Sequence, residues 1–203
     1  MILPPNDKSR EYELRAMGLR DFAGLKTARQ RLDPFALAYY AKLAVATFEQ
    51  IALSDEARRQ LIEKGKNEWS GGASSQTLPD GRKLIILNPT HGKNRQNATL
   101  MEEISHVFLG HKPSRLAISA ETDDGRATAR DYDAKIEAQA YSVGAAALVP
   151  YAGLRELVFE GKSSREIARH YAVSKLLVEF RIKTTHLWRA YLKEQESRRY
   201  GIE

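Results

Sequence analysis

Residues 102–106 read Glu-Glu-Ile-Ser-His. Apolar residues surround it at helical spacing, namely Leu100, Met101, Ile104, Val107, Phe108 and Leu109. Positions i and i+4 share one face of a helix, so Glu102 and His106 can both point at one ion. Glu103 lies one step around the helix, where a carboxylate could hold an attacking water.

This arrangement is one residue away from the H-E-x-x-H motif, in which two metal ligands and a general base come from little more than one helical turn. Glu102 stands where the motif has its first His. A carboxylate is also a ligand of zinc, manganese or iron. Thr99-x-x-Glu102 equally fits a capping box, in which the Glu side chain bonds the backbone at a helix start. The pattern leaves both roles open.

The composition is that of an ordinary soluble protein. The 203 residues suffice for one sizeable core, or for one domain with an appended helical piece. Cysteine is absent, so disulfides and thiolate metal sites are excluded, and any metal must use His and carboxylates. The first eight residues show no apolar signal region and no apolar run approaches membrane-spanning length, so we expect a cytoplasmic protein.

The net charge of +6 is unevenly distributed. Residues 1–31 carry seven Lys/Arg against four acids, and residues 151–203 carry eleven against seven. Residues 32–150 carry fourteen against fifteen. Basic ends suit an acidic partner or nucleic acid, and they equally suit a solvated helix face.

Local patterns predict an α+β fold in which a small antiparallel sheet packs against the motif helix. The expected elements are helices over Ser9–Leu19 and from Pro34 to Leu43, a strand over Ala44–Ile51, a helix from Ser54 to near Gly65, strands over Glu68–Ser75 and Lys83–Leu87, the motif helix ending near Gly110, a hairpin over 114–130, and a helix from Asp131 to Pro150. Asp33 is a suitable N-cap, with Pro at the first helical position. Pro79-Asp80-Gly81 has the residue types of a turn.

The tail from residue 151 is predicted to be helical throughout. Its expected helices cover Leu154–Glu160, Arg165–Tyr171 and Lys175 to about Glu196, and the segment Ser164–Thr184 has helix-turn-helix spacing. DNA reading would need basic and polar side chains where the second helix starts. That start is Lys175-Leu176-Leu177-Val178, so we expect packing against the rest of the chain instead of sequence-specific DNA binding.

Between Ile85 and Pro150 the chain resembles the ImmA/IrrE family of metallopeptidases. Members pair a strand ending in Asn-Pro with a helix of the form Arg-x-x-x-Thr-x-x-His-Glu-x-x-His, and a later helix closes on Leu-x-Pro. The matching residues here are Asn88-Pro89, Arg95, Thr99, Glu103, His106, Glu137, Ala140 and Leu148-Val149-Pro150, with Val143-Gly144 where the family prefers Phe-Ala. The likeness spans the body from about residue 32, and no motif covers the tail.

The resemblance implies a zinc-dependent endopeptidase fold whose usual target is a helix-turn-helix repressor, cut to release stress-response or mobile-element genes. By position in the motif, Glu102 and His106 would be metal ligands, Glu137 the third ligand and Glu103 the general base.

Two further residues could contribute to such a site. His111 and Tyr141 are possible oxyanion or substrate contacts, as polar donors near the ion. His111 equally suits a helix C-terminus, where a cation meets the helix dipole.

The predicted ligand set bears on the metal. Glu102, His106 and Glu137 would supply two negative charges, where two His and one Glu supply one. An oxygen-rich set weakens the ion's pull on its water and shifts preference towards manganese or iron. We expect one divalent ion, with zinc first and manganese or iron as alternatives.

The predicted function is that of a metal-dependent endopeptidase acting on a protein. The predicted parts are an N-terminal arm over 1–31, a metallopeptidase-like domain over 32–150 and a helical C-terminal subdomain over 151–203. Two other functions remain open: a non-hydrolytic protein-binding module on the same fold, and a DNA-associated regulator acting through the basic ends. Metal content separates the first two, and salt-dependent DNA binding tests the third.

Overall fold

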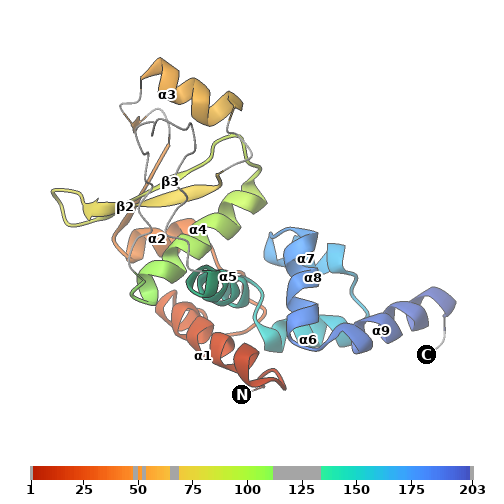
Figure 1. Cartoon of the computed structure of the whole chain (residues 1–203). Coiled ribbons are helices and arrows are strands. Elements are labelled where there is room, and N and C mark those ends of the chain that lie inside the picture. The colour runs from red at the N-terminus through yellow and green to blue at the C-terminus, as the bar shows by residue number, and fades with distance from the viewer. Residues whose placement is uncertain (1, 48–49, 52–53, 65–68, 112–133, 202–203) are drawn as a thin grey trace.

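The computed structural model describes residues 2–47, 50–51, 54–64, 69–111 and 134–201 (Figure 1). Its elements are α1 (Asp7–Phe22), α2 (Pro34–Tyr40), β1 (Leu43–Ala46), α3 (Asp55–Arg59) continued by the π-helical turn η2 (Gln60–Lys64), β2 (Gly71–Thr77), β3 (Lys83–Leu87), α4 (Lys93–Phe108), α5 (Ala134–Leu148), α6 (Tyr151–Phe159), α7 (Ser164–Tyr171), α8 (Lys175–Thr184) and α9 (Trp188–Tyr200). The predicted α+β class is confirmed. The expected hairpin over 114–130 and the expected cap at Asp131 lie outside the described residues.

The sheet is mixed, with strand order β1-β3-β2. The expected hairpin is present, because β2 runs antiparallel to β3 and the chain reverses at Gly81, whose φ of +81° suits glycine. The expectation of a wholly antiparallel sheet is wrong, since β1 pairs with β3 in parallel, with Leu43 opposite Lys83. Parallel strands need a long connection, and the chain between them supplies one through α3 and β2.

The helix that carries the motif lies between the sheet and α5. In Figure 1, α4 crosses beneath the strands, α5 lies against α4, and α1 lies along the far side of α5. Side chains from each layer are buried between them: Ile85 of β3, Leu100 and Ile104 of α4, and Val143 of α5. Apolar burial of this kind is the main force holding helices and sheet together.

The N-terminal helix α1 is longer than the predicted Ser9–Leu19 and is built into the core. Asn6 caps it by accepting a hydrogen bond from Ser9 N, and Ala16 and Leu19 are buried. Its buried face also contains Glu13 and Arg20, so the helix lacks an apolar stripe. For that reason the sequence pattern indicated a short helix followed by a polar arm.

A buried ion pair fastens the N-terminal helix to the tail. Arg181 of α8 pairs with Glu13 of α1, and both side chains are almost fully buried. Arg181 Nε also donates to Val149 O at 3.0 Å, and Glu13 accepts from the backbone N–H of Tyr151. The pair therefore joins α1 and α8 to the junction between α5 and α6, so the first and last parts of the chain contact each other directly.

The tail is helical, as expected, but its last long helix is divided. The expectation of one helix from Lys175 to about Glu196 is wrong, because α8 ends at Thr184 and α9 starts at Trp188. His186 between them has a φ of +61°. Thr184 and Thr185 donate their hydroxyls back to carbonyls of the preceding turn, which competes with continued helix.

Among the described residues, no helix has both the length and the apolar character needed to cross a bilayer.

Removing the Arg181 side of the buried ion pair is predicted to be strongly destabilising. Arg181→Met leaves Glu13 charged and buried beside an apolar chain, and breaking such pairs typically costs about 3–5 kcal/mol of unfolding free energy. Arg29→Met is the matched control, because Arg29 pairs with Glu160 at the surface, where such pairs contribute about 0–1 kcal/mol. Urea denaturation of both variants measures the difference, and equal losses would contradict the assignment.

Candidate metal centre

Glu102 and His106 lie in the interior of α4, on the face expected from their spacing. The helix begins at Lys93, with Gly92 as its N-cap, so Glu102 lies well beyond its first turn. Thr99 is buried in the middle of the helix, so the capping-box alternative for Glu102 is excluded. A Glu this far inside a helix cannot reach the backbone N–H groups that the first turn leaves unpaired.

The partner helix α5 approaches α4 closely at Gly144. A Cβ atom added at Gly144 would lie 3.2 Å from both the Met101 carbonyl oxygen and Ser105 Oγ. A side chain at this position would force its neighbours to move by a few tenths of an ångström, so glycine favours the present separation of the two helices. Two turns earlier on α5, this approach carries Glu137 to the face of α4 that holds Glu102 and His106.

The three predicted ligands converge. Ligand atoms of Glu102, His106 and Glu137 all lie within 4.8 Å of one another. Glu137 Oε2 is 3.4 Å from His106 Nε2, and these two side chains are 21% and 16% exposed. One imidazole and two carboxylates, partly shielded from water, form a donor set that fits a divalent ion. The group could therefore hold the metal that the sequence predicted, without fixing its identity.

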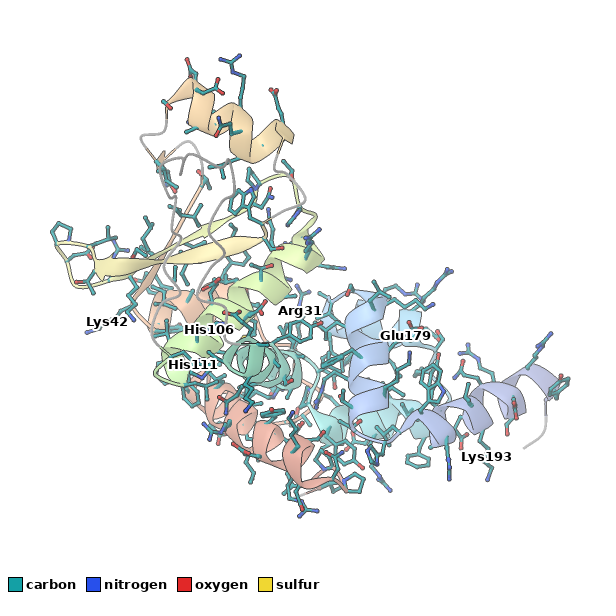
Figure 2. The ribbon with its side chains drawn as sticks, viewed as in Figure 1. Arg31, Lys42, His106, His111, Glu179 and Lys193 are labelled. Atoms are coloured by element: carbon teal, nitrogen blue, oxygen red, sulfur yellow. The ribbon has the colours of Figure 1, made fainter. Side chains whose placement is uncertain are left out.

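The His106 ring is held through Nδ1, the nitrogen that does not face Glu137. His111 Nδ1 lies 3.1 Å from His106 Nδ1, and Figure 2 labels both residues. His111 Nε2 lies 3.1 Å from Gln139 Oε1. With the Gln139 oxygen as acceptor, His111 carries its proton on Nε2 and accepts at Nδ1 from the protonated Nδ1 of His106. This series of hydrogen bonds leaves a lone pair on His106 Nε2, on the side of Glu137, as a metal ligand requires.

Tyr141 lies one helical turn after Glu137 on α5. Its ring packs edge-on against Phe180 of α8, with centroids 5.1 Å apart. Burial, together with the negative charge of Glu102, raises the pKa of Tyr141 above its ordinary value. The hydroxyl is therefore neutral near pH 7 and can donate a hydrogen bond in the neighbourhood of Glu102.

The predicted site residues thus gather around the contact between α4 and α5. Glu102, His106 and Glu137 meet directly, His111 touches His106, and Tyr141 experiences the charge of Glu102. Glu103 is partly buried on the same turn of α4.

Two residues that position the site were not identified from the sequence. Gln139, which fixes His111, belongs to no motif, and its position two residues after Glu137 gave no signal. Gly144 was noticed only as a departure from a family preference. A single glycine inside a helical apolar pattern does indicate close packing, and that signal could have identified it.

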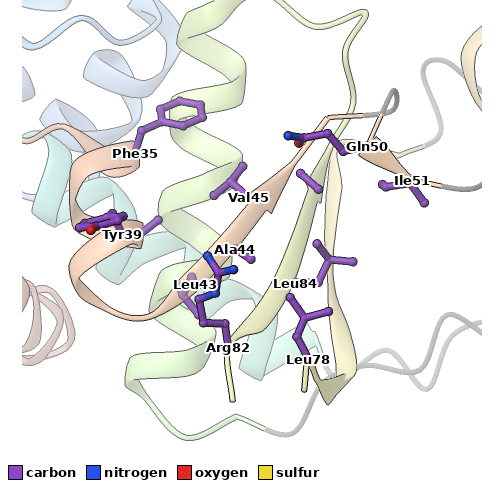
Figure 3. A pocket seen from close by; sticks show the side chains of 12 residues that line it. Phe35, Tyr39, Leu43, Ala44, Val45, Gln50, Ile51, Leu78, Arg82 and Leu84 are labelled. Carbon is purple, nitrogen blue, oxygen red and sulfur yellow. The ribbon is translucent and has the colours of Figure 1, made fainter. Parts of the chain in front are cut away.

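A separate hollow of about 620 Å³ lies beside β1, between α2 and the turn that follows β2 (Figure 3). Its lining includes Phe35, Tyr39, Leu43, Val45 and Arg82. None of the predicted site residues lines it, so it is distinct from the cluster of Glu102, His106 and Glu137.

Comparison with known proteins supports one family. The model of Peptidase M78, described as the IrrE N-terminal-like domain, matches residues 48–183, which is more than half of the chain. No curated protein matches the chain. The matched span includes α4 and α5 and therefore all of the predicted ligands.

Enlarging Gly144 is predicted to separate α4 from α5. Gly144→Val forces extra methyl groups against Met101 and Ser105, and overpacking typically costs about 1–3 kcal/mol. Metal affinity should fall as well, because Glu137 moves away from Glu102 and His106. Ala138→Val is the control, since Ala138 is exposed on the same helix. Denaturation and chelator competition report the two effects, and identical behaviour of both variants would refute the role of Gly144.

Removing the support behind His106 is predicted to weaken metal binding without unfolding the protein. His111→Phe keeps a planar ring but loses both ring nitrogens, and loss of such a supporting hydrogen bond typically costs about 10–100-fold in metal affinity. His170→Phe, on the exposed side of α7, is the control. Chelator competition with zinc and with manganese provides the measurement, and an unchanged affinity in His111→Phe would count against the positioning role.

Proposed function

Because the chain belongs to the Peptidase M78 family, we propose that it is a metal-dependent endopeptidase that hydrolyses a protein substrate. The family supports a metallopeptidase-type function in general. One structural observation carries the finer assignment: Glu102, His106 and Glu137 bring their ligand atoms within 4.8 Å of one another at the contact between two helices.

In this proposal Glu102, His106 and Glu137 hold one divalent ion. The ion, when bound, polarises the scissile carbonyl and makes water more acidic. His111 and Gln139 keep the His106 ring in the orientation and tautomer that ligation needs. Two carboxylates among the ligands favour manganese or iron more than a set with two His would, although zinc remains the first candidate.

Glu103 acts as the general base. It follows Glu102 directly and precedes His106 by three residues, so its side chain projects beside the ligand-bearing face of α4. Its carboxylate takes a proton from the attacking water and returns it to the leaving amine of the cut peptide bond. No cysteine is present in the sequence, so a thiol nucleophile does not compete with this mechanism.

Tyr141 supplies the stabilising hydrogen bond to the developing oxyanion. Its raised pKa keeps the hydroxyl protonated, and it lies on α5 one turn from Glu137. A neutral donor aimed at a developing negative charge lowers the barrier.

The proposed substrate is a helix-turn-helix transcriptional regulator in the cytoplasm, cut in a stress response. This part of the proposal rests on the resemblance to the ImmA/IrrE family. A regulator encoded beside the gene for this chain is the first candidate to assay.

A non-hydrolytic protein-binding module is the second candidate function. The observation that favours it is Glu102, which replaces a neutral ligand by a charged one and so reduces the acidifying effect of a bound ion. Such a module would keep the fold and the metal but not the cleavage.

Cleavage by the metal-loaded parent separates these two candidates, and replacing Glu103 tests its role as the general base. Base catalysis typically contributes about 10²–10⁴-fold, so Glu103→Gln should reduce the cleavage rate by about that factor while metal content and unfolding free energy stay unchanged. His106→Ala should lose both metal and cleavage. Glu194→Gln on α9 is the matched control and should cleave like the parent.

The readouts are cleavage of the candidate regulator, elemental analysis of the metal and urea denaturation. Cleavage by Glu103→Gln at the parent rate would exclude Glu103 as the base. Metal-loaded parent protein that cleaves no candidate would favour the binding module.

A further inference from the structure

Helices α7 and α8 form a helix-turn-helix joined by residues 172–174. Ser163 and Glu166 make a capping box at the start of α7, and Ala172 takes a left-handed conformation that ends it. Ile167 and Tyr171 of α7 and Leu177 and Val178 of α8 are buried. Leu177 and Val178 therefore belong to the core, whereas Leu176 at the same helix start is exposed.

A basic hollow of about 670 Å³ opens at this turn. Its lining includes Arg165 and Arg169 of α7, Lys175 of α8 and Asn94 of α4, together with small residues such as Ala172. Asn94 donates its side-chain amide to Val173 O at 3.1 Å, which fixes the start of α4 against the turn. The hollow is thus built by three helices held together.

The cations of the hollow are largely uncompensated. Arg165 and Arg169 are exposed, lie one helical turn apart, and make no ion pair with any residue that the structure describes. Two other arginines of the tail do have acidic partners, since Arg181 pairs with Glu13 and Arg198 pairs with Glu166. Lys175 pairs with Glu179 at 3.1 Å, and the partial positive charge of the α8 N-terminus adds to the same hollow.

We propose that this hollow binds the phosphate backbone of duplex DNA without reading base sequence. The cations come from separate helices around an open hollow, which suits neighbouring phosphates along a strand. Base reading is not supported, because Leu176, at 76% exposure, and the paired Glu179 occupy the outer face of the first turns of α8. The proposal does not depend on peptidase activity.

The test measures binding of a short fluorescent duplex to the full chain by anisotropy at several salt concentrations. The parent should bind, and its affinity should fall steeply between about 50 and 200 mM salt. The double variant Arg165→Gln/Arg169→Gln should bind the duplex about tenfold or more weakly than the parent at the lowest salt concentration. The slope of log affinity against log salt concentration should be smaller in magnitude by about 2, since each lost phosphate contact removes about 0.9. Two duplexes of unrelated sequence should bind equally.

The matched control is Arg189→Gln with Lys193→Gln on α9. It removes the same charge from two exposed cations that are also one turn apart, and Figure 2 places Lys193 on α9 at a distance from the labelled Glu179 of α8. All four substitutions are at exposed positions, so circular dichroism should report intact folding.

The proposal is supported if this control binds the duplex like the parent while the Arg165 and Arg169 variant loses affinity for it. Equal losses of affinity in both variants would show that net charge alone explains the binding, and would overturn the proposal. Absence of binding at low salt, or marked sequence selectivity, would also overturn it. A poly-glutamate competitor that displaces the duplex as well as unlabelled DNA does would reassign the hollow to an acidic protein partner.

Discussion

The close approach of α4 and α5 at Gly144 is the constraint on which the candidate metal centre depends. With no side chain there, the α5 backbone lies within van der Waals reach of Met101 and Ser105. At this separation of the two helices, Glu137 reaches Glu102 and His106. A packing detail in the core therefore sets the geometry of polar groups that lie at its edge, since interiors are dense and transmit small displacements.

Buried polar contacts then fix the remaining helices around this pair. Arg20 of α1 donates to the carbonyl of Ala147 at 2.8 Å, near the end of α5. Glu13 and Arg181 join α1 and α8 at the start of α6. These groups are satisfied by specific partners, and unsatisfied burial would be costly, so they select one arrangement of the helices. Through Phe180, α8 also packs against Tyr141, which connects the tail to the candidate site.

Elements whose start or end depends on local chemistry were predictable. Asp33 caps α2 with its carboxylate, the turn after β2 has its glycine at Gly81, and Ser54 caps α3. Elements whose environment is decided by distant residues were not predictable from the sequence. Helix α1 can bury Glu13 and Arg20 because Arg181 pairs with Glu13 and the carbonyl of Ala147 accepts from Arg20. Its buried face is therefore not an apolar stripe that the sequence pattern could reveal. The parallel pairing of β1 with β3 likewise follows from chain topology, which periodicity does not encode.

The sequence by itself determined that Glu102 and His106 share a helix face, because the 3.6-residue period of an α-helix puts positions i and i+4 together. It also excluded cysteine chemistry and indicated the family. The tertiary structure decided that Thr99 and Glu102 lie inside α4, which removes the capping alternative. It also decided that Glu137 and His111 reach opposite nitrogens of one imidazole. The contact with Glu137 joins two separate helices, so its distance depends on how closely α4 and α5 pack, whereas His111 reaches His106 from only five residues later in the chain.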